Sequence, residues 1–206
     1  MDSPIELSSL EEDMLKELFN LGVGKAAASL SRMVKQEVVL SVPQVSFQTT
    51  NELLHMLGDE NEIVSISQDI KGPFEARSML LFHEENSMHV VKQMLGKQIP
   101  DEMLAELQEE ALTEIGNVVL NACIGAISKS MNEKFCVDIP SFIQANPEQI
   151  VNANHLLKES TILLLEIDMT LKESDVTGYL AFIFGPDALN NLSQSIKNML
   201  NNLGAA

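Results

Sequence analysis

A carboxylate followed three residues later by a carboxamide occurs twice in the chain, as Glu17 with Asn20 and as Glu114 with Asn117. Side chains three residues apart are neighbours on one face of a helix. Each pair would therefore present a charged acceptor beside an amide group that both donates and accepts hydrogen bonds. One such pair is typical of an ordinary solvated helix face. The second pair, 97 residues further along, indicates a shared chemical role.

The 97-residue offset extends beyond these two pairs. Asp13 lies one turn before Glu17, and Glu110 takes the same place before Glu114. The offset also relates Pro43 to Pro140, Leu10 to Leu107, Leu15 to Leu112 and Ser31 to Ser128. This period is much longer than the roughly 20–50 residues of a solenoid repeat. We therefore interpret the chain as one domain built from two half-repeats, residues 1–97 and 98–206.

The repeated proline has a geometric interpretation. If the first helix runs to about Gln36, Asn20 lies roughly 24 Å from its end at a rise of 1.5 Å per residue. A strand returning over 37–43 covers about 23 Å, which would place Pro43 level with Asn20, and Pro140 level with Asn117. Because a strand proline belongs at an edge or a bulge, it would fix the backbone beside the polar side chains. An ordinary proline at a strand end is the alternative.

Small side chains dominate residues 22–31. The run Gly22-Val-Gly-Lys25 lacks the spacing and the preceding strand of a phosphate-binding loop. Small residues in the middle of a helix indicate close packing against another helix. Gly24 falls in the same stripe as the motif residues, where it would leave the surface flat for a partner; a plain packing role is the alternative.

Hydrophobic periodicity and turn residues predict the same order of elements in both halves: a long helix, a strand, a short helix, two strands and a closing helix. In the first half these elements lie at 9–35, 37–49, 51–58, 62–71, 74–83 and 84–95. In the second half they lie at 101–132, 134–145, 147–157, 160–172, 175–184 and 186–202, with a loop at 172–175. The prediction is an α+β fold whose duplicated half-domains, related by a pseudo-two-fold axis, share one largely antiparallel sheet covered by two long motif-bearing helices.

Composition narrows the class of protein. The chain has 206 residues, 45% of them hydrophobic, and a net charge of −17, which argues against binding to nucleic acid or to an anionic membrane surface. We expect no membrane insertion and no secretory signal. The four histidines have no metal-binding spacing, and no nucleophile or cofactor motif is present. Cys123 and Cys136 are expected to be two buried thiols in a reducing cytoplasm.

The repeated pattern Asp-x3-Glu-x2-Asn-x22-Pro resembles the signature of the CheC/CheX/FliY family of chemotaxis phosphatases, which dephosphorylate the response regulator CheY. The first copy matches at Asp13, Glu17, Asn20 and Pro43, and the second at Glu114, Asn117 and Pro140. Glu110 stands where the family has Asp or Ser. The resemblance covers nearly the whole chain and implies the same duplicated arrangement of halves.

The resemblance also implies roles for the motif residues. Asn20 and Asn117 would orient the water that attacks the aspartyl phosphate of CheY-P, and Glu17 and Glu114 would contact a lysine of the regulator. The first acidic residue of each motif would lie at the rim of the site. Such chemistry depends mainly on positioning and electrostatics, so the protein would need no cofactor of its own, and the Mg²⁺ would belong to CheY.

A module that binds CheY-P without hydrolysing it, in the chemotaxis or flagellar-switch system, is the alternative. FliY-like proteins carry a flagellar-switch domain and an N-terminal regulator-binding segment, and CheX-like proteins carry one motif per chain and dimerise. Two motifs in 206 residues therefore favour a monomeric protein of the CheC type. The family implies the receptor deamidase CheD as a second partner, for which the short helix predicted at Pro147–Leu157 is the candidate surface.

Overall fold

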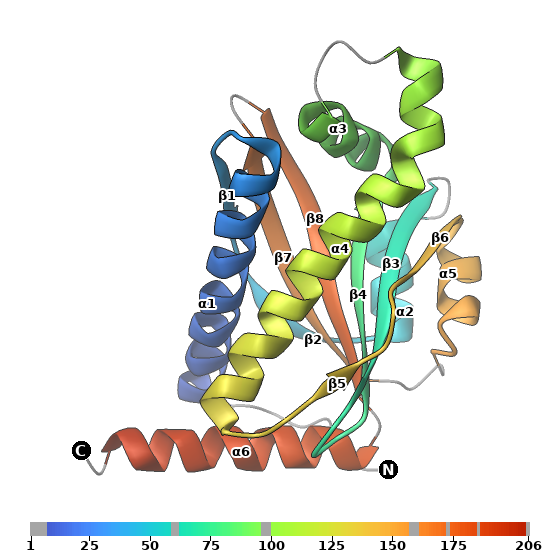
Figure 1. Cartoon of the computed structure of the whole chain (residues 1–206). Coiled ribbons are helices and arrows are strands. Elements are labelled where there is room, and N and C mark those ends of the chain that lie inside the picture. Colours follow the sequence, from blue (N-terminus) through green and yellow to red (C-terminus); the bar gives the residue numbers. More distant parts are fainter. Residues whose placement is uncertain are drawn as a thin grey trace.

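The computed structural model describes residues 8–58, 62–95, 100–156, 161–171, 174–184 and 186–204 (Figure 1). The helices are α1 (Ser9–Val34), α2 (Thr50–Leu57), α3 (Glu84–Leu95), α4 (Asp101–Met131), α5 (Pro147–Ala153) and α6 (Pro186–Gly204). The strands are β1 (Val38–Ser41), β2 (Val45–Thr49), β3 (Ile63–Lys71), β4 (Ala76–His83), β5 (Cys136–Val137), β6 (Ser141–Ala145), β7 (Thr161–Leu171) and β8 (Ser174–Phe184). The order of the elements was predicted correctly, and most bounds agree within two residues. The helix predicted at 147–157 is shorter, because α5 ends at Ala153 with Asn154 as its C-cap.

All the strands belong to one antiparallel sheet, and its two sides are built alike. The order is β1-β7-β8-β4-β3-β5, with β2 also pairing with β7 and β6 with β3. One row across the sheet reads Val45, Leu165, Leu180, Leu80, Ile66 and Phe142. The outer pair, Val45 and Phe142, keeps the 97-residue offset, whereas the inner pairs, Leu165 with Ile66 and Leu180 with Leu80, are 99 and 100 residues apart. The strand order is still symmetric from either edge, which places a pseudo-two-fold axis between Leu80 and Leu180. The predicted fold class is confirmed, whereas the boundary between residues 97 and 98 lies outside the described residues.

Helices cover both faces of the sheet. In Figure 1, α1 and α4 lie side by side in front of the strands, α6 crosses below them, and α2 and α5 lie behind. The larger core forms on the α1 and α4 face and includes Phe19 against Phe182, with ring centroids 5.1 Å apart. A smaller core under α2 and α5 includes Leu53 and Ile150. The sheet is thus buried on both sides, which explains its nearly continuous apolar strands.

The two long helices begin differently but end alike. A capping box starts α1. The Ser8 hydroxyl accepts a hydrogen bond from the backbone N–H of Glu11, and the Glu11 carboxylate accepts one from the backbone N–H of Ser8 at 2.8 Å. Pro100 precedes α4 without a side-chain cap. At the other end, Lys35 and Asn132 both adopt a left-handed conformation, with φ of 54° and 53°. These residues are 97 positions apart, so in each half of the chain the segment after the long helix turns back toward the motif at the same point.

Gly22 brings α1 and α4 into close contact, as the run of small residues predicted. A Cβ at this position would lie 2.8 Å from the Cα of Cys123 on α4. By length and apolar composition α4 could cross a membrane, but half of its apolar stretch is buried within the protein. That burial is typical of a core helix.

Three predictions about local structure are wrong. The strands expected at 37–49 and 134–145 are each divided, into β1 and β2 and into β5 and β6, because proline has no N–H for the ladder. Cys136 is exposed, since β5 is a two-residue strand at the edge of the sheet. The loop was expected at 172–175, but β8 already begins at Ser174, opposite Leu171, and residues 172–173 lie outside the described residues.

Candidate functional site

The first motif lies on the outer surface of α1. Asp13 and Glu17 are exposed, and Asn20, one turn further along, is half-buried. A Cβ added at Gly24 would meet nothing within 4 Å, so this glycine leaves the surface open and is not required for packing. Leu21, 52% exposed, adds apolar area beside the carboxylates. The helix thus presents a charged, polar and partly apolar surface to a partner.

Asn20 is fixed by the chain that returns from α1. Its Oδ1 accepts a hydrogen bond of 3.0 Å from the backbone N–H of Val42. Val42 is buried and immediately precedes the exposed Pro43. Because the residue before a proline is restricted to extended conformations, Pro43 helps to hold this N–H in place. The sequence prediction that Pro43 returns level with Asn20 agrees with this contact.

The second motif occupies the equivalent surface of α4. Glu110 and Glu114 are exposed, and Asn117 and Asn121 are half-buried. A Cβ on the neighbouring Gly116 would lie 2.4 Å from the Ile66 side chain, so the helix sits directly on β3 at this point. Close packing on the sheet brings Asn117 within reach of side chains from β3.

The donors to Asn117 differ from those to Asn20. Its Oδ1 accepts from the Asn121 Nδ2 at 2.6 Å and from the Gln68 Nε2 on β3 at 3.3 Å. Ile139, which occupies the position of Val42 in the repeat, is 91% exposed. Its N–H has no bond to Asn117 among the described contacts, although Pro140 follows it as Pro43 follows Val42. The expectation that the two prolines act alike is therefore not supported for the second motif.

Gln68 and the Val42 backbone N–H are the contributors that sequence reasoning missed. Gln68 is 3% exposed, and its Oε1 is buried without a hydrogen-bond partner. It lies between Ile66 and Ile70 on the helix-covered face of β3, so strand alternation places a polar side chain at a core position. That mismatch was the available signal. The role of Val42 could not be read from its side chain, because only its backbone contacts Asn20.

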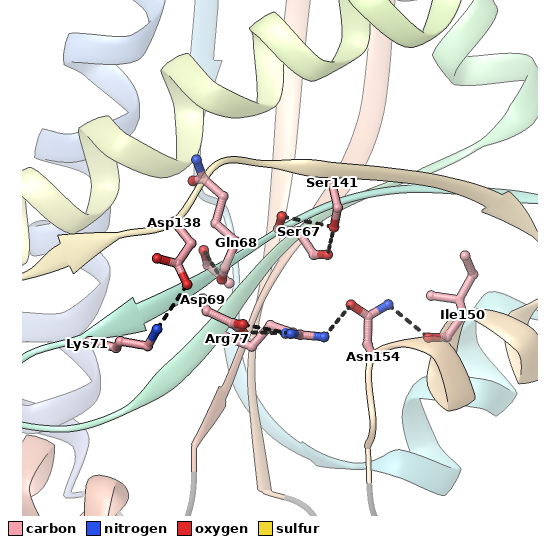
Figure 2. Close-up of polar contacts among 10 residues, drawn as sticks. Ser67, Gln68, Asp69, Lys71, Arg77, Asp138, Ser141, Ile150 and Asn154 are labelled. Atoms are coloured by element: carbon pink, nitrogen blue, oxygen red, sulfur yellow. Dashed lines mark hydrogen bonds and ion pairs between the residues drawn. The ribbon is translucent and has the colours of Figure 1, made fainter.

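A polar network lies on the other face of β3, next to Gln68 (Figure 2). Arg77 donates to both carboxylate oxygens of Asp69, at 2.7 and 2.9 Å, and to Asn154 at 3.4 Å. This contact with Arg77 lowers the pKa of the Asp69 carboxyl. Asn154, just after α5, is buried and donates to the backbone of Ile150. The network ties α5 to the strand that also carries Gln68.

No grouping of three or more His, Cys, Asp or Glu side chains that could hold a metal occurs within the described ranges. Burial raises the pKa of the Cys123 thiol to about 12, which makes it unreactive at neutral pH. The motif side chains themselves are carboxylates and carboxamides. Such groups can dock a cation and orient a water molecule.

Comparison with known proteins supports the family resemblance. No family model matches the chain. It is 21% identical over 122 residues to the CheY-P phosphatase CheC of Bacillus subtilis, covering 56% of this chain and 57% of that protein. It is 18% identical over 195 residues to the flagellar motor switch phosphatase FliY of the same organism, covering 92% of this chain and 51% of that protein. The matches thus span just over half the length of each relative.

Solved structures share the fold. The structure of Thermotoga maritima FliY matches with a TM-score of 0.74 and 17% identity, over 95% of this chain and 100% of that one. A chain of the FliG–FliM complex from H. pylori matches with a TM-score of 0.67 and 10% identity, over 91% and 100%. A chain of the CheX–CheY–BeF3–Mg²⁺ complex from Borrelia burgdorferi matches with a TM-score of 0.50 and 18% identity, over 82% and 97%.

Proposed function

We propose that this protein of the CheC/CheX/FliY family is a phosphatase that hydrolyses the aspartyl phosphate of CheY-P. One observation carries the proposal: Glu17 is exposed on α1, and the carboxamide of Asn20, one turn away, is fixed by the Val42 backbone. The sequence relatives are CheY-P and flagellar-switch phosphatases. One structural neighbour is a CheX–CheY complex.

In this proposal the asparagine orients the attacking water. A carboxamide is too weak a base to remove a proton, but it holds hydrogen-bond partners in a fixed geometry. With the Oδ1 of Asn20 tied to Val42, rotation of the amide is restricted. The reaction then gains from pre-organisation, because the amide that positions the water is already fixed before the regulator docks. The Mg²⁺ that neutralises the phosphoryl charge would be supplied by CheY.

The glutamates dock the regulator. Glu17 and Glu114 are exposed, so each is free to pair with a lysine of CheY when the contact excludes water. Asp13 and Glu110, one turn earlier and also exposed, would add charge at the rim. Both motif helices lie on one face of the sheet (Figure 1).

The test is release of phosphate from phosphorylated CheY with Mg²⁺ and substoichiometric amounts of this protein. Asn20→Ala together with Asn117→Ala should reduce the stimulated rate by roughly 100-fold or more, the scale seen when a polar group that acts in the transition state is removed. The matched control is Asn201→Ala, an exposed asparagine on α6. Unchanged turnover in the double variant would refute the proposal.

The second candidate is a binding module for CheY-P that performs no hydrolysis. The likeness to a chain of the FliG–FliM complex favours it, because the same fold occurs in a structure solved as a complex of two proteins. Stoichiometric binding of CheY-P without faster phosphate loss would establish this function. CheD remains a proposed further partner, and α5, which lies on the opposite face of the sheet from α1 and α4 (Figure 1), remains its proposed contact.

A further inference from the structure

The carboxamide oxygens of Asn20 and Asn117 have different numbers of donors. A carboxamide oxygen has two lone pairs. Among the described contacts, the Oδ1 of Asn20 accepts one hydrogen bond, from the Val42 N–H at 3.0 Å. The Oδ1 of Asn117 accepts two, from Asn121 at 2.6 Å and from Gln68 at 3.3 Å. Asn20 therefore keeps a lone pair for a further partner, whereas both lone pairs of Asn117 are occupied.

The difference is encoded at two equivalent positions. Asn121 donates to Asn117 from one turn along α4, but the matching residue on α1 is Gly24, which has no side chain. Gln68 lies two residues after Ile66 on β3. Ile167 lies two residues after Leu165, which is the partner of Ile66 in the symmetric row across the sheet. Ile167 cannot donate, so the α1 motif lacks both of the side-chain donors that surround Asn117.

The burial of the Gln68 side chain lowers the stability of the folded protein. The residue is 3% exposed, and its Oε1 has no hydrogen-bond partner. A buried polar atom without a partner destabilises a protein, and such atoms are associated with functional roles. An apolar residue such as the equivalent Ile167 would fill this core position without that cost. The polar side chain is therefore better explained by its bond to Asn117 than by packing.

The chemistry of the attacking water makes the difference important. For in-line attack, a lone pair of the water oxygen must face the phosphorus, so the hydrogens must point to acceptors. Asn20 can supply such an acceptor through its remaining lone pair. Asn117, with its oxygen saturated, can offer only its Nδ2 donor, which would hold the water oxygen but leaves no acceptor on this side chain for the water's hydrogens.

We propose that the two motifs are chemically unequal: the α1 motif orients the attacking water, and the α4 motif docks the phosphorylated regulator but is held inactive by the hydrogen bonds of Asn121 and Gln68 to Asn117. This inference rests on the proposed phosphatase function. Asn121 and Gln68 act through Asn117, so they are positioning residues.

The test exchanges the donors between the motifs. Asn20→Ala leaves only the α4 motif, and adding Asn121→Ala to it should raise kcat about fivefold, since it frees one lone pair of the Asn117 Oδ1. The same change also removes the bond from Asn121 to the Asn117 backbone oxygen. Adding Gln68→Met to Asn20→Ala should raise kcat by less, because the hydrogen bond from Gln68 is longer.

Asn117→Ala leaves only the α1 motif, and adding Gly24→Asn to it should lower kcat about fivefold relative to the matched variant Gly24→Ala, which adds a Cβ but no donor. KM for CheY-P should change little in each case, and circular dichroism checks that every variant is folded.

Two results would overturn the inference. One is a loss of activity from Asn117→Ala that equals or exceeds the loss from Asn20→Ala. The other is a decrease in kcat when Asn121→Ala is added to Asn20→Ala, which would mean that Asn121 supports the reaction. Both results require an active wild-type protein. If the wild type does not accelerate phosphate loss, the phosphatase proposal itself fails and this inference falls with it, so the two failures are distinguishable.

Discussion

The side chains of Gln68 and Asp69 are adjacent on β3 but face opposite sides of the sheet. Gln68 points to the motif on α4, whereas Asp69 is bound by Arg77. At the residue scale, the strand therefore carries a polar contact on each face. The contact with Arg77 can be measured separately, because it is ionic and depends on pH.

Asp69→Asn should reduce the free energy of unfolding at pH 7 by about 1 kcal/mol, since the pair is bidentate but partly screened by solvent. Arg77 lowers the pKa of Asp69 in the folded protein. The stabilisation is therefore present above the unfolded pKa, about 3.9, and is lost as pH falls through the lower folded value. Urea unfolding of both proteins between pH 7 and pH 2 measures this, with Asp138→Asn at the exposed pair with Lys71 as the control. A difference that persisted at the lowest pH would show that packing, and not charge, is responsible.

At the scale of elements, the contact between α1 and α4 depends on a missing side chain. Gly22→Ala would place a Cβ 2.8 Å from the Cα of Cys123, and the backbone cannot yield as a flexible side chain could. We expect a loss of about 1–3 kcal/mol of stability, as for other overpacked sites. Gly125→Ala on α4 is the matched control, because its Cβ would meet nothing within 4 Å, and it should stabilise the protein by about 0.5–1 kcal/mol. Thermal unfolding of both variants measures the two changes in stability. If Gly22→Ala stabilised the protein, the close contact between α1 and α4 at this position would be contradicted.

The elements themselves were largely predictable from the sequence, and the reasons are local. Ser8 and Glu11 mark the start of α1, and apolar runs bounded by turn residues mark the paired strands. The division of the strands at Pro43 and Pro140 was not predicted, because it depends on where the backbone N–H groups bond: that of Val42 goes to a side chain on α1. The exposure of Cys136 likewise depends on its place at the edge of the sheet, which a single strand pattern does not reveal.

The motif residues were found because their spacing is local to one helix. Glu17 and Asn20 are one turn apart on α1, and the repeat gave Glu114 and Asn117 the same significance. The donors that distinguish the two asparagines come partly from β3, 49 residues from Asn117 in the case of Gln68. A local pattern can show that Gln68 is a polar residue at a core position of β3, but its contact with Asn117 depends on the packing of a helix on a sheet and is not encoded locally.

At the scale of the whole molecule, the halves are joined through their central elements. β4 and β8 pair in the middle of the sheet, from Ala76 opposite Phe184 to Leu81 opposite Tyr179. On the same chain, α1 of the first half packs on α4 of the second at Gly22 and Cys123. The larger core draws on both long helices and on strands from both halves. Neither half can lose its structure without exposing apolar surface of the other, so we expect the two to unfold together.

The two cysteines report on this cooperativity. Cys136 is exposed and should react rapidly with a thiol reagent, whereas Cys123 is buried at the helix crossing with its pKa raised to about 12, so it should react only when the protein opens. In a Cys136→Ser variant, the rate of Cys123 labelling should rise with urea along the same transition as the circular dichroism signal. Gly22→Ala should shift both curves to lower urea by the same amount. Labelling of Cys123 at urea concentrations where the circular dichroism is still native would mean that α1 separates from α4 on its own, with the sheet intact. In that case α1 would be able to move independently of the segment after β1 whose Val42 N–H holds Asn20.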